Sequence, residues 1–299
     1  MKNKRTLAHI LALFTSVVWG TTFVSTRILI TNGLSPHGIM FVRFIIGYIM
    51  LCILSKGRIK VKSLKEEFLF ALAGLCGMTL YQLFENVALS YTQASNVSVL
   101  ISIAPLITGI LASRFSGEKL TNSFLLGFII SISGIFIIGL NDSFVLKISP
   151  KGDLLAILGA VVWGFYSIIT KALGSRGYNI ISVTRRIFFY GMTITALVMP
   201  ALGFDVTLSY FTTPKFLFNL MYLGLIASAI CFVTWNYAIK ILGATKSSVY
   251  IYLNPLITML FSVVFLSEHI TTYMVIGTVL IVTGLLISEM RDKRAKKLS

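Results

Sequence analysis

Apolar segments of about 20 residues recur along the whole chain, and they constrain its fold more than any other feature. A transmembrane helix needs about 20 mostly apolar residues to cross the hydrocarbon region of a bilayer. Such segments lie near 7–29, 36–55, 68–90, 95–114, 122–140, 153–172, 180–201, 216–239, 245–266 and 270–289. Because the connections between them are short, the sequence predicts an all-α integral membrane protein with ten transmembrane helices and no inserted soluble domain.

The composition supports a bilayer as the solvent of this chain. Of its 299 residues 56% are hydrophobic and 12% are charged, whereas a soluble domain has about 25% charged residues. The net charge of +16 would suggest nucleic acid as a partner of a soluble protein, but here the basic residues form short tracts between apolar segments, such as 56–62 and 291–297. We therefore expect the lipid bilayer, and not a nucleic acid, as the partner of the basic residues.

The basic residues also predict the orientation of the chain. If the N-terminus is cytoplasmic and successive loops alternate, 21 of the 26 Lys and Arg residues fall on the cytoplasmic side. Loops rich in Lys and Arg stay in the cytoplasm. We predict a multi-pass protein of the cytoplasmic membrane with both termini inside the cell.

The two halves of the sequence resemble each other. With a shift of 144 residues, Trp19-Gly20 aligns with Trp163-Gly164, and with a shift of 150, Pro105-Leu106-Ile107-Thr108 aligns with Pro255-Leu256-Ile257-Thr258. Each half holds five predicted spans, an odd number, so the second half is expected to enter the membrane inverted. Inverted repeats are a feature of many secondary transporters, whose substrate sites lie near the midplane between the repeats.

The sequence gives no sign of a cofactor, a metal site or catalytic residues. Cys52, Cys76 and Cys231 lie inside apolar segments without a CxxC motif, and the three histidines have no ligand spacing. A Walker motif for ATP is also absent from the sequence. We expect no cofactor, no metal and no catalytic residue, and therefore no enzyme.

A set of short motifs that occurs twice resembles the EamA family of the drug/metabolite transporter superfamily. The motifs are Trp19-Gly20-Thr21-Thr22-Phe23, Ala88-Leu89-Ser90-Tyr91, Pro105-Leu106 and Gly117-Glu118-Lys119-Leu120-Thr121 in the first half, and Trp163-Gly164, Asn236-Tyr237-Ala238, Pro255-Leu256 and Glu268 in the second. The resemblance implies one five-helix EamA repeat in 1–148 and a second, inverted one in 149–299, around a central cavity. It also implies that metabolites, often amino acids or exported drug-like compounds, are moved by alternating access.

Small polar residues beside a proline mark one wall of the expected cavity. Ser98, Ser102 and Pro105 share a face of the fourth segment, and Tyr252 and Pro255 share the corresponding face of the ninth. Each proline removes a backbone hydrogen bond and frees the carbonyl four residues earlier. The alternative is a kinked structural helix whose hydroxyl groups bond to its own backbone.

Two tryptophans lie at equivalent mid-span positions. Trp19 shares a helix face with Thr22, and Trp163 shares one with Tyr166. Tryptophan normally prefers the membrane interfaces, and an indole N–H at the midplane needs a partner. We interpret both as cavity residues, with ordinary helix packing as the alternative.

Glu85 is the one acidic residue that lies clearly inside a predicted span. An ionisable group within the membrane indicates function by default and needs a partner. Arg43 lies at a similar depth, to within roughly 3 Å at 1.5 Å per residue, which favours a structural ion pair. A carboxylate that binds a cation or carries a proton is the alternative.

These residues define two predicted sets. The residues expected to line the substrate cavity are Trp19, Thr22, Gln82, Glu85, Ser98, Ser102, Trp163, Tyr166, Trp235 and Tyr252. The residues expected to be structural are Arg43, Pro105, Pro255, Gly127, Gly134, Gly277 and Gly284, the glycines for close helix packing.

The sequence thus predicts a secondary transporter that exports small organic solutes. Its partners are a small-molecule substrate, the bilayer and a coupling ion such as a proton, and a homodimer is left open. The alternatives are an integral-membrane enzyme and a solute-binding membrane scaffold that transports nothing.

Reporter fusions test the orientation. A reporter fused after Asp142 is expected outside the cell, and one fused after Ser299 is expected inside, because five spans separate the two sites. The activities of a paired periplasmic and cytoplasmic reporter measure this directly. Equal location of both sites would contradict the ten-helix topology and the inverted repeat together.

Overall fold

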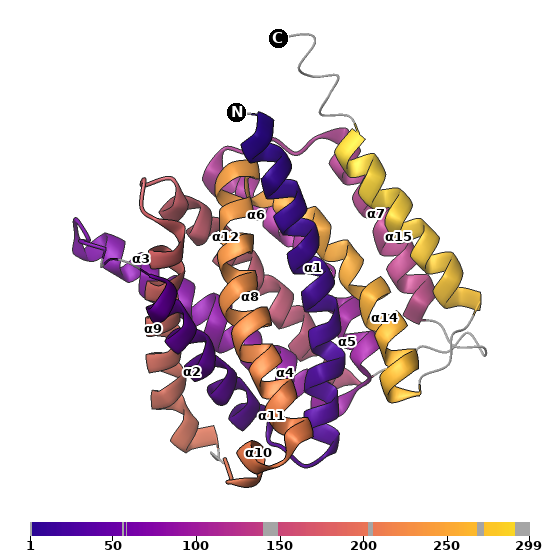
Figure 1. The fold of residues 1–299 in the computed structure, drawn as a ribbon. Coiled ribbons are helices and arrows are strands. Elements are labelled where there is room, and N and C mark those ends of the chain that lie inside the picture. The colour runs from indigo at the N-terminus through magenta and orange to yellow at the C-terminus, as the bar shows by residue number, and fades with distance from the viewer. Residues whose placement is uncertain are drawn as a thin grey trace.

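The computed structural model describes residues 2–55, 57, 59–139, 149–202, 206–267 and 272–290, and every regular element in these ranges is helical (Figure 1). The first half holds α1 (Lys2–Thr31), α2 (Pro36–Leu54), α3 (Leu64–Gly74), the π-helical η1 (Leu75–Leu80), α4 (Tyr81–Tyr91), α5 (Ala94–Ile101), α6 (Ala104–Ser116) and α7 (Asn122–Gly139).

The second half continues with the same kinds of element. They are α8 (Pro150–Gly174), α9 (Ile180–Val198), the 3₁₀-helical η2 (Met199–Leu202), α10 (Ser209–Thr212), α11 (Pro214–Met221), the π-helical η3 (Tyr222–Ile230), α12 (Cys231–Leu242), α13 (Ala244–Ser248), the 3₁₀-helical η4 (Val249–Tyr252), α14 (Leu253–Leu266) and α15 (Thr272–Met290).

Eight continuous helices among the described residues are long and apolar enough to cross a membrane. They correspond to eight of the ten predicted segments, and the other two appear as the shorter apolar stretches Asn122–Ile137 and Val275–Ser288. Helix α1 begins and α15 ends at the same end of the bundle (Figure 1). The membrane-helical class is therefore established, whereas the count of ten spans and the inverted orientation stay predictions.

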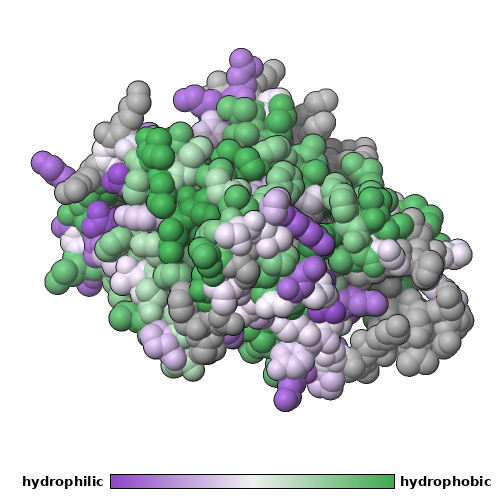
Figure 2. Space-filling model, turned by 60° about the horizontal axis from the view of Figure 1, so that its bottom comes forward, coloured by the Kyte–Doolittle hydropathy of each residue, from purple (hydrophilic) through white to green (hydrophobic). Residues whose placement is uncertain are grey.

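The outer surface of the bundle is apolar, as a lipid solvent requires. Large hydrophobic side chains such as Ile53 (74% exposed), Leu197 (77%) and Val264 (72%) are turned outward. Figure 2 shows a broad hydrophobic surface with hydrophilic residues gathered in patches. In water such a surface would drive aggregation, so the arrangement agrees with a helical membrane protein.

Irregular turns occur at matching places in the two halves. The π-helical segments η1 and η3 overlap when the first is shifted by 150 residues, and the α-helix is also interrupted shortly before Pro105 and shortly before Pro255. The left-handed residues that end α6 and α14 are Gly117 (φ 64°) and Ser267 (φ 56°), again 150 apart. Both breaks lie where a proline removes a backbone donor, as the sequence predicts.

Helices of one half pack into the other half. Helix α1 packs against α12 and α14 of the second half, while α8 packs against α4 and α6 of the first. Most of the large buried side chains, contributed by both halves, form one central cluster. Each half thus buries its first helix in the other.

Helices α7 and α15 pack closely through the glycines that the sequence singled out. A Cβ added to Gly127 would lie 2.5 Å from the Gly284 carbonyl oxygen, and one added to Gly134 would lie 2.8 Å from the Cβ of Leu280. Both distances are well below van der Waals contact, so the helix axes approach as closely as they do because these positions carry no side chain.

Glu118 joins the two halves at the end of the bundle where α6 and α8 end. Its carboxylate accepts a hydrogen bond from Lys171 Nζ (2.6 Å) and from the backbone N–H groups of Ala244 (2.9 Å) and Thr245 (3.0 Å) at the start of α13. Burial opposes its ionisation, but these hydrogen bonds hold the pKa of the Glu118 carboxyl below its usual value of 4.5. Its repeat counterpart, Glu268, lies outside the described residues.

Alanine at Gly127 tests the close contact of α7 and α15. We expect Gly127→Ala to lower the free energy of unfolding by about 1–3 kcal/mol, because the added methyl forces the helices apart. Gly159→Ala is the matched control: its added Cβ would meet only ordinary contacts, at 3.8 and 3.9 Å, so its melting temperature in detergent should be unchanged or higher. Equal melting temperatures of the two variants would contradict the close packing.

The Glu118 contacts predict a pH-dependent stability. A carboxyl whose pKa is lowered by folding stabilises the protein above the pKa of the unfolded chain, and this stabilisation is lost as the pH falls through the lowered value. Glu118→Gln should therefore cost about 1–3 kcal/mol at pH 7, with a difference from the wild type that shrinks below about pH 4.5. Thermal unfolding from pH 7 to pH 4 measures it, and a difference that does not depend on pH would contradict the role of the charge.

Candidate functional site

The two mid-span tryptophans meet at the centre of the bundle. The ring centroids of Trp19 on α1 and Trp163 on α8 lie 5.1 Å apart in an edge-on arrangement. Trp235 of α12 lies 5.0 Å from Trp19, and Tyr81 of α4 lies 4.8 Å from Trp163. The first helix of each half thus brings one indole to a shared aromatic cluster.

The indole N–H groups of this cluster are not equally satisfied. Trp19 Nε1 donates a hydrogen bond of 3.0 Å to the carbonyl oxygen of Ala227. Ala227 lies in the π-helical η3. Trp163 Nε1 and Trp235 Nε1 are buried without a hydrogen-bond partner in the described part of the chain. A buried donor without a partner costs about 1–3 kcal/mol, so these groups are available to a polar ligand or to water.

A group of buried polar side chains lies beside the aromatic cluster. Arg43 of α2 is 1% exposed, and its guanidinium donates to Ser228 Oγ (3.0 Å) and to Gln82 Oε1 (2.8 Å). Glu85 is 2% exposed and accepts a hydrogen bond from Tyr81, one helical turn earlier.

Arg43 and Glu85 face the same space, but no direct ion pair joins them in the structure. The ion pairs found among the described residues are those of Lys171 with Glu118, Arg176 with Glu66 and Arg186 with Glu67. The predicted structural pair of Arg43 and Glu85 is therefore indirect here: Gln82 and Ser228 hold the arginine, and Tyr81 holds the carboxylate.

A small enclosed space separates these groups. Its volume is about 10 Å³, which is about enough for one water molecule. The residues that line it are Trp19, Thr22, Phe23, Arg43, Tyr81, Gln82, Glu85, Trp163 and Phe232. The space is therefore a polar centre with aromatic walls, closed to a larger molecule in this conformation.

Half of the predicted cavity residues line this space, and half lie elsewhere. Trp19, Thr22, Gln82, Glu85 and Trp163 line it, whereas Ser98, Ser102, Tyr166, Trp235 and Tyr252 do not. Tyr166 and Trp235 stand behind Trp163 as further members of the aromatic cluster.

The serines and Tyr252 differ more clearly from the expectation. Ser98 and Ser102 donate to carbonyl oxygens of their own helix, those of Ser95 and Ser98, both at 2.8 Å. Tyr252 belongs to a separate hydrophobic cluster with Val99 of α5 and with residues of α7 and α15. The self-bonded alternative describes the two serines in this conformation.

Arg43, which the sequence predicts as a structural residue, also lines this space, and three further lining residues were not predicted from the sequence. Tyr81 lies four residues before Glu85, on the same face of α4, so helical spacing could have identified it. Phe232 is the repeat counterpart of Gln82, at a shift of 150. Phe23 belongs to the motif Trp19-Gly20-Thr21-Thr22-Phe23, but an aromatic residue in an apolar helix is ordinary, so nothing in the sequence marked its side chain as a lining residue.

The charged and aromatic side chains of this centre are suited to binding a small solute. In the part of the chain that the structure describes, no group of three or more His, Cys, Asp or Glu residues could hold a metal ion. A guanidinium, a carboxylate and several aromatic rings can together accommodate a small solute that carries both charges or a single cation.

Comparisons with known proteins agree with one another. The model of the EamA-like transporter family matches residues 6–140 and again residues 150–290. An uncharacterized transporter of Clostridium kluyveri is 28% identical, over 97% of this chain and 95% of its own length. A probable terminal-alkyne amino-acid exporter of Streptantibioticus cattleyicolor is 29% identical, over 93% of this chain and 92% of its own length.

A solved structure described only as "Crystal structure of protein" has the same fold. Its TM-score is 0.74, with 20% sequence identity and coverage of 97% of this chain and 98% of that one. At this identity the likeness concerns the fold alone. The family model, by contrast, matches most of the chain in two consecutive copies, and on that ground this protein belongs to the EamA-like transporter family.

Proposed function

We propose that this membrane transporter is a secondary transporter that exports small organic solutes across the cytoplasmic membrane by alternating access. In this proposal ten helices cross the membrane as two inverted repeats, both termini are cytoplasmic, and no chemical step occurs. The observation that carries the proposal is the enclosed centre in which Arg43 and Glu85 face one space among aromatic rings.

The charges of this centre suit an amino acid or a related metabolite. An ammonium group would face the Glu85 carboxylate and the rings of Trp19 and Trp163, since a cation is attracted to an aromatic face. A carboxylate would meet Arg43, whose guanidinium is always charged. The name of the Streptantibioticus cattleyicolor relative, a probable exporter of an amino acid, supports this choice of solutes.

The small volume of the central space supports a mechanism in which the two halves of the protein move relative to each other. Ligand pockets commonly have volumes of about 300–1,000 Å³, whereas this space measures about 10 Å³. A solute can enter only if the halves separate on one side. Glu118 with Lys171 joins the halves at the proposed cytoplasmic end, and opening that end would break this contact.

Two other functions make different predictions. An integral-membrane enzyme would change its substrate covalently, and a binding scaffold would hold a solute without flux. Purified protein in proteoliposomes separates the three: labelled amino acids are loaded on one side, and counterflow and the chemical state of the label are measured. Flux of unchanged label supports transport, whereas altered label or binding without flux supports one of the alternatives.

Glu85→Gln tests the central site. The variant should fold with nearly the wild-type melting temperature, because Arg43 keeps its contacts with Gln82 and Ser228. Its initial transport rate should fall about tenfold or more, which corresponds to the loss of one charge-assisted contact. Asp153→Asn is the matched control: it makes the same change at a carboxylate that contacts Asn96 and the Ser149 N–H, and it should retain the wild-type rate.

The opposite result would support the structural alternative. A large fall in melting temperature that a second change, Arg43→Gln, restores would mean that Glu85 serves mainly to balance a buried arginine. Unchanged transport and unchanged stability at all pH values would contradict both roles.

A further inference from the structure

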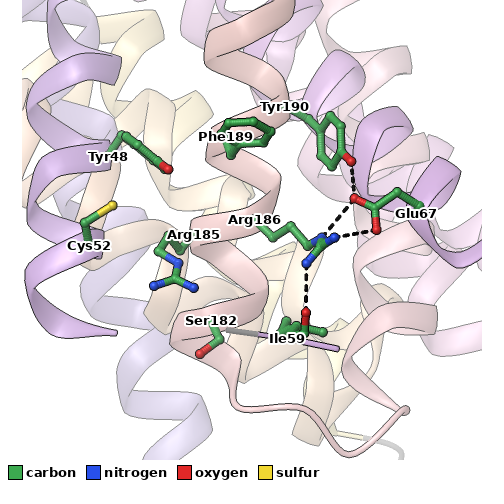
Figure 3. A pocket seen from close by; sticks show the side chains of 9 residues that line it. All are labelled: Tyr48, Cys52, Ile59, Glu67, Ser182, Arg185, Arg186, Phe189 and Tyr190. Atoms are coloured by element: carbon green, nitrogen blue, oxygen red, sulfur yellow. Dashed lines mark hydrogen bonds and ion pairs between the residues drawn. The ribbon is translucent and has the colours of Figure 1, made fainter. Parts of the chain in front are cut away.

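A second, larger cavity lies at the end of the bundle where α2 ends and α3 and α9 begin. Its volume is about 410 Å³. Tyr48 and Cys52 of α2 face Arg185 and Phe189 of α9 across it (Figure 3). It shares no lining residue with the central space, so the transport proposal does not account for it.

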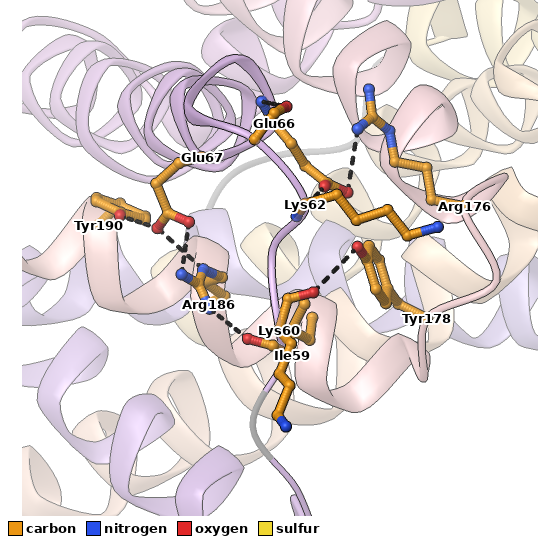
Figure 4. Close-up of polar contacts among 10 residues, drawn as sticks. Ile59, Lys60, Lys62, Glu66, Glu67, Arg176, Tyr178, Arg186 and Tyr190 are labelled. Atoms are coloured by element: carbon orange, nitrogen blue, oxygen red, sulfur yellow. Dashed lines mark hydrogen bonds and ion pairs between the residues drawn. The ribbon is translucent and has the colours of Figure 1, made fainter.

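One of the two neighbouring arginines is fully engaged in the structure. Arg186 donates to both carboxylate oxygens of Glu67, at 3.0 and 2.5 Å, and to the carbonyl oxygen of Ile59 at 3.0 Å (Figure 4). Tyr190 also hydrogen-bonds Glu67. The charge of Arg186 is therefore balanced within the protein.

The other arginine has no balancing charge. Arg185 donates to the Gly57 carbonyl oxygen at 2.8 Å, and within the described ranges no carboxylate forms an ion pair with it. The two carboxylates at the start of α3, Glu66 and Glu67, are already paired with Arg176 and Arg186. The Arg185 guanidinium reaches between Cys52 and Ser182 (Figure 3), where it gives the cavity an uncompensated positive charge that suits an anion, above all a phosphate group.

Exposed apolar side chains lie next to the residues that line the cavity: Phe189 is itself a lining residue, and Ile49 and Ile53 directly follow the lining residues Tyr48 and Cys52 in α2. Ile49 and Ile53 of α2 are 54% and 74% exposed, and Phe189 of α9 is 44% exposed. These side chains belong to the lipid-facing surface of the same two helices. An occupant that suits both parts has an anionic head and hydrocarbon chains.

We propose that this cavity binds the phosphate-bearing headgroup of an anionic glycerophospholipid, with Arg185 as its main contact. The acyl chains extend over Ile49, Ile53 and Phe189. Anionic lipids of the cytoplasmic leaflet attract basic side chains at the membrane surface. A soluble phosphate ester shares the headgroup chemistry but would gain nothing from the exposed apolar side chains next to the cavity.

The native cysteines allow a test on the unmodified full-length chain. Cys52 is exposed in the cavity, whereas Cys76 and Cys231 are buried. Delipidated protein in detergent is treated with a polar maleimide, and the rate of single labelling is followed by intact mass. Phosphatidylglycerol at about ten times its dissociation constant should slow the labelling about tenfold, because about one site in ten stays open, while phosphatidylcholine should have little effect.

A parallel experiment with glycerol phosphate distinguishes a lipid headgroup from a soluble phosphate ester as the bound ligand. Glycerol phosphate should give no protection at the concentration at which phosphatidylglycerol protects. Equal protection by glycerol phosphate, equal protection by phosphatidylcholine, or no protection by phosphatidylglycerol would each overturn the proposal.

Charge variants show whether Arg185 is the contact. Arg185→Gln should shift the phosphatidylglycerol titration about tenfold or more to higher concentration, with the protection of each variant measured against its own labelling rate in the absence of lipid, because an arginine beside a thiol changes its reactivity. Arg114→Gln is the matched control, since it removes one exposed arginine from the last turn of α6 at the same end of the bundle, and it should leave the titration within about twofold of the wild type. Equal effects of the two substitutions would mean that general surface charge, and not the cavity, binds the lipid.

Discussion

The exchange of first helices between the two halves is the interaction on which the rest of this structure depends. Helix α1 lies in the second half and α8 lies in the first, so neither half can bury its own helices alone. The two meet at Trp19 and Trp163, 5.1 Å apart. Because both helices bring an indole to the same point, the centre of the bundle is aromatic, and the polar side chains of α2 and α4 reach it from the side.

This arrangement gives the protein a centre that is closed to solutes and that contains buried polar groups without hydrogen-bond partners among the described residues. Trp163 Nε1 and Trp235 Nε1 have no partner in the described part of the chain, while Arg43 and Glu85 are held by neutral neighbours and not by each other. Water in a bilayer-spanning bundle is scarce, so such groups are costly unless a ligand or another conformation uses them. A transporter that opens and closes around this centre would use them in each cycle.

The two cavities differ in the way their charges are arranged. In the central one, a positive and a negative group face the same space, which suits a small solute with both charges. In the peripheral one, Glu67 balances Arg186, whereas Arg185 bonds only a backbone carbonyl and forms no ion pair among the described residues. The same helix α9 thus contributes one arginine to an ion pair with α3 and the preceding arginine to the lining of the cavity.

The sequence by itself determined the membrane-helical class, the repeat and the family, because these depend on properties that repeat along the chain: apolar length, basic loops and motifs at a constant shift. It also predicted Trp19, Trp163, Gln82 and Glu85 as cavity residues, because a polar or bulky side chain in the middle of a transmembrane segment needs a partner inside the bundle. Only the tertiary structure decided which partners they meet. Ser98 and Ser102 turn back to their own helix, Arg43 bonds Gln82 and Ser228, and Arg185 lacks a carboxylate. Helical spacing determines which residues share a face, but the rotation and approach of the neighbouring helices determine what that face contacts.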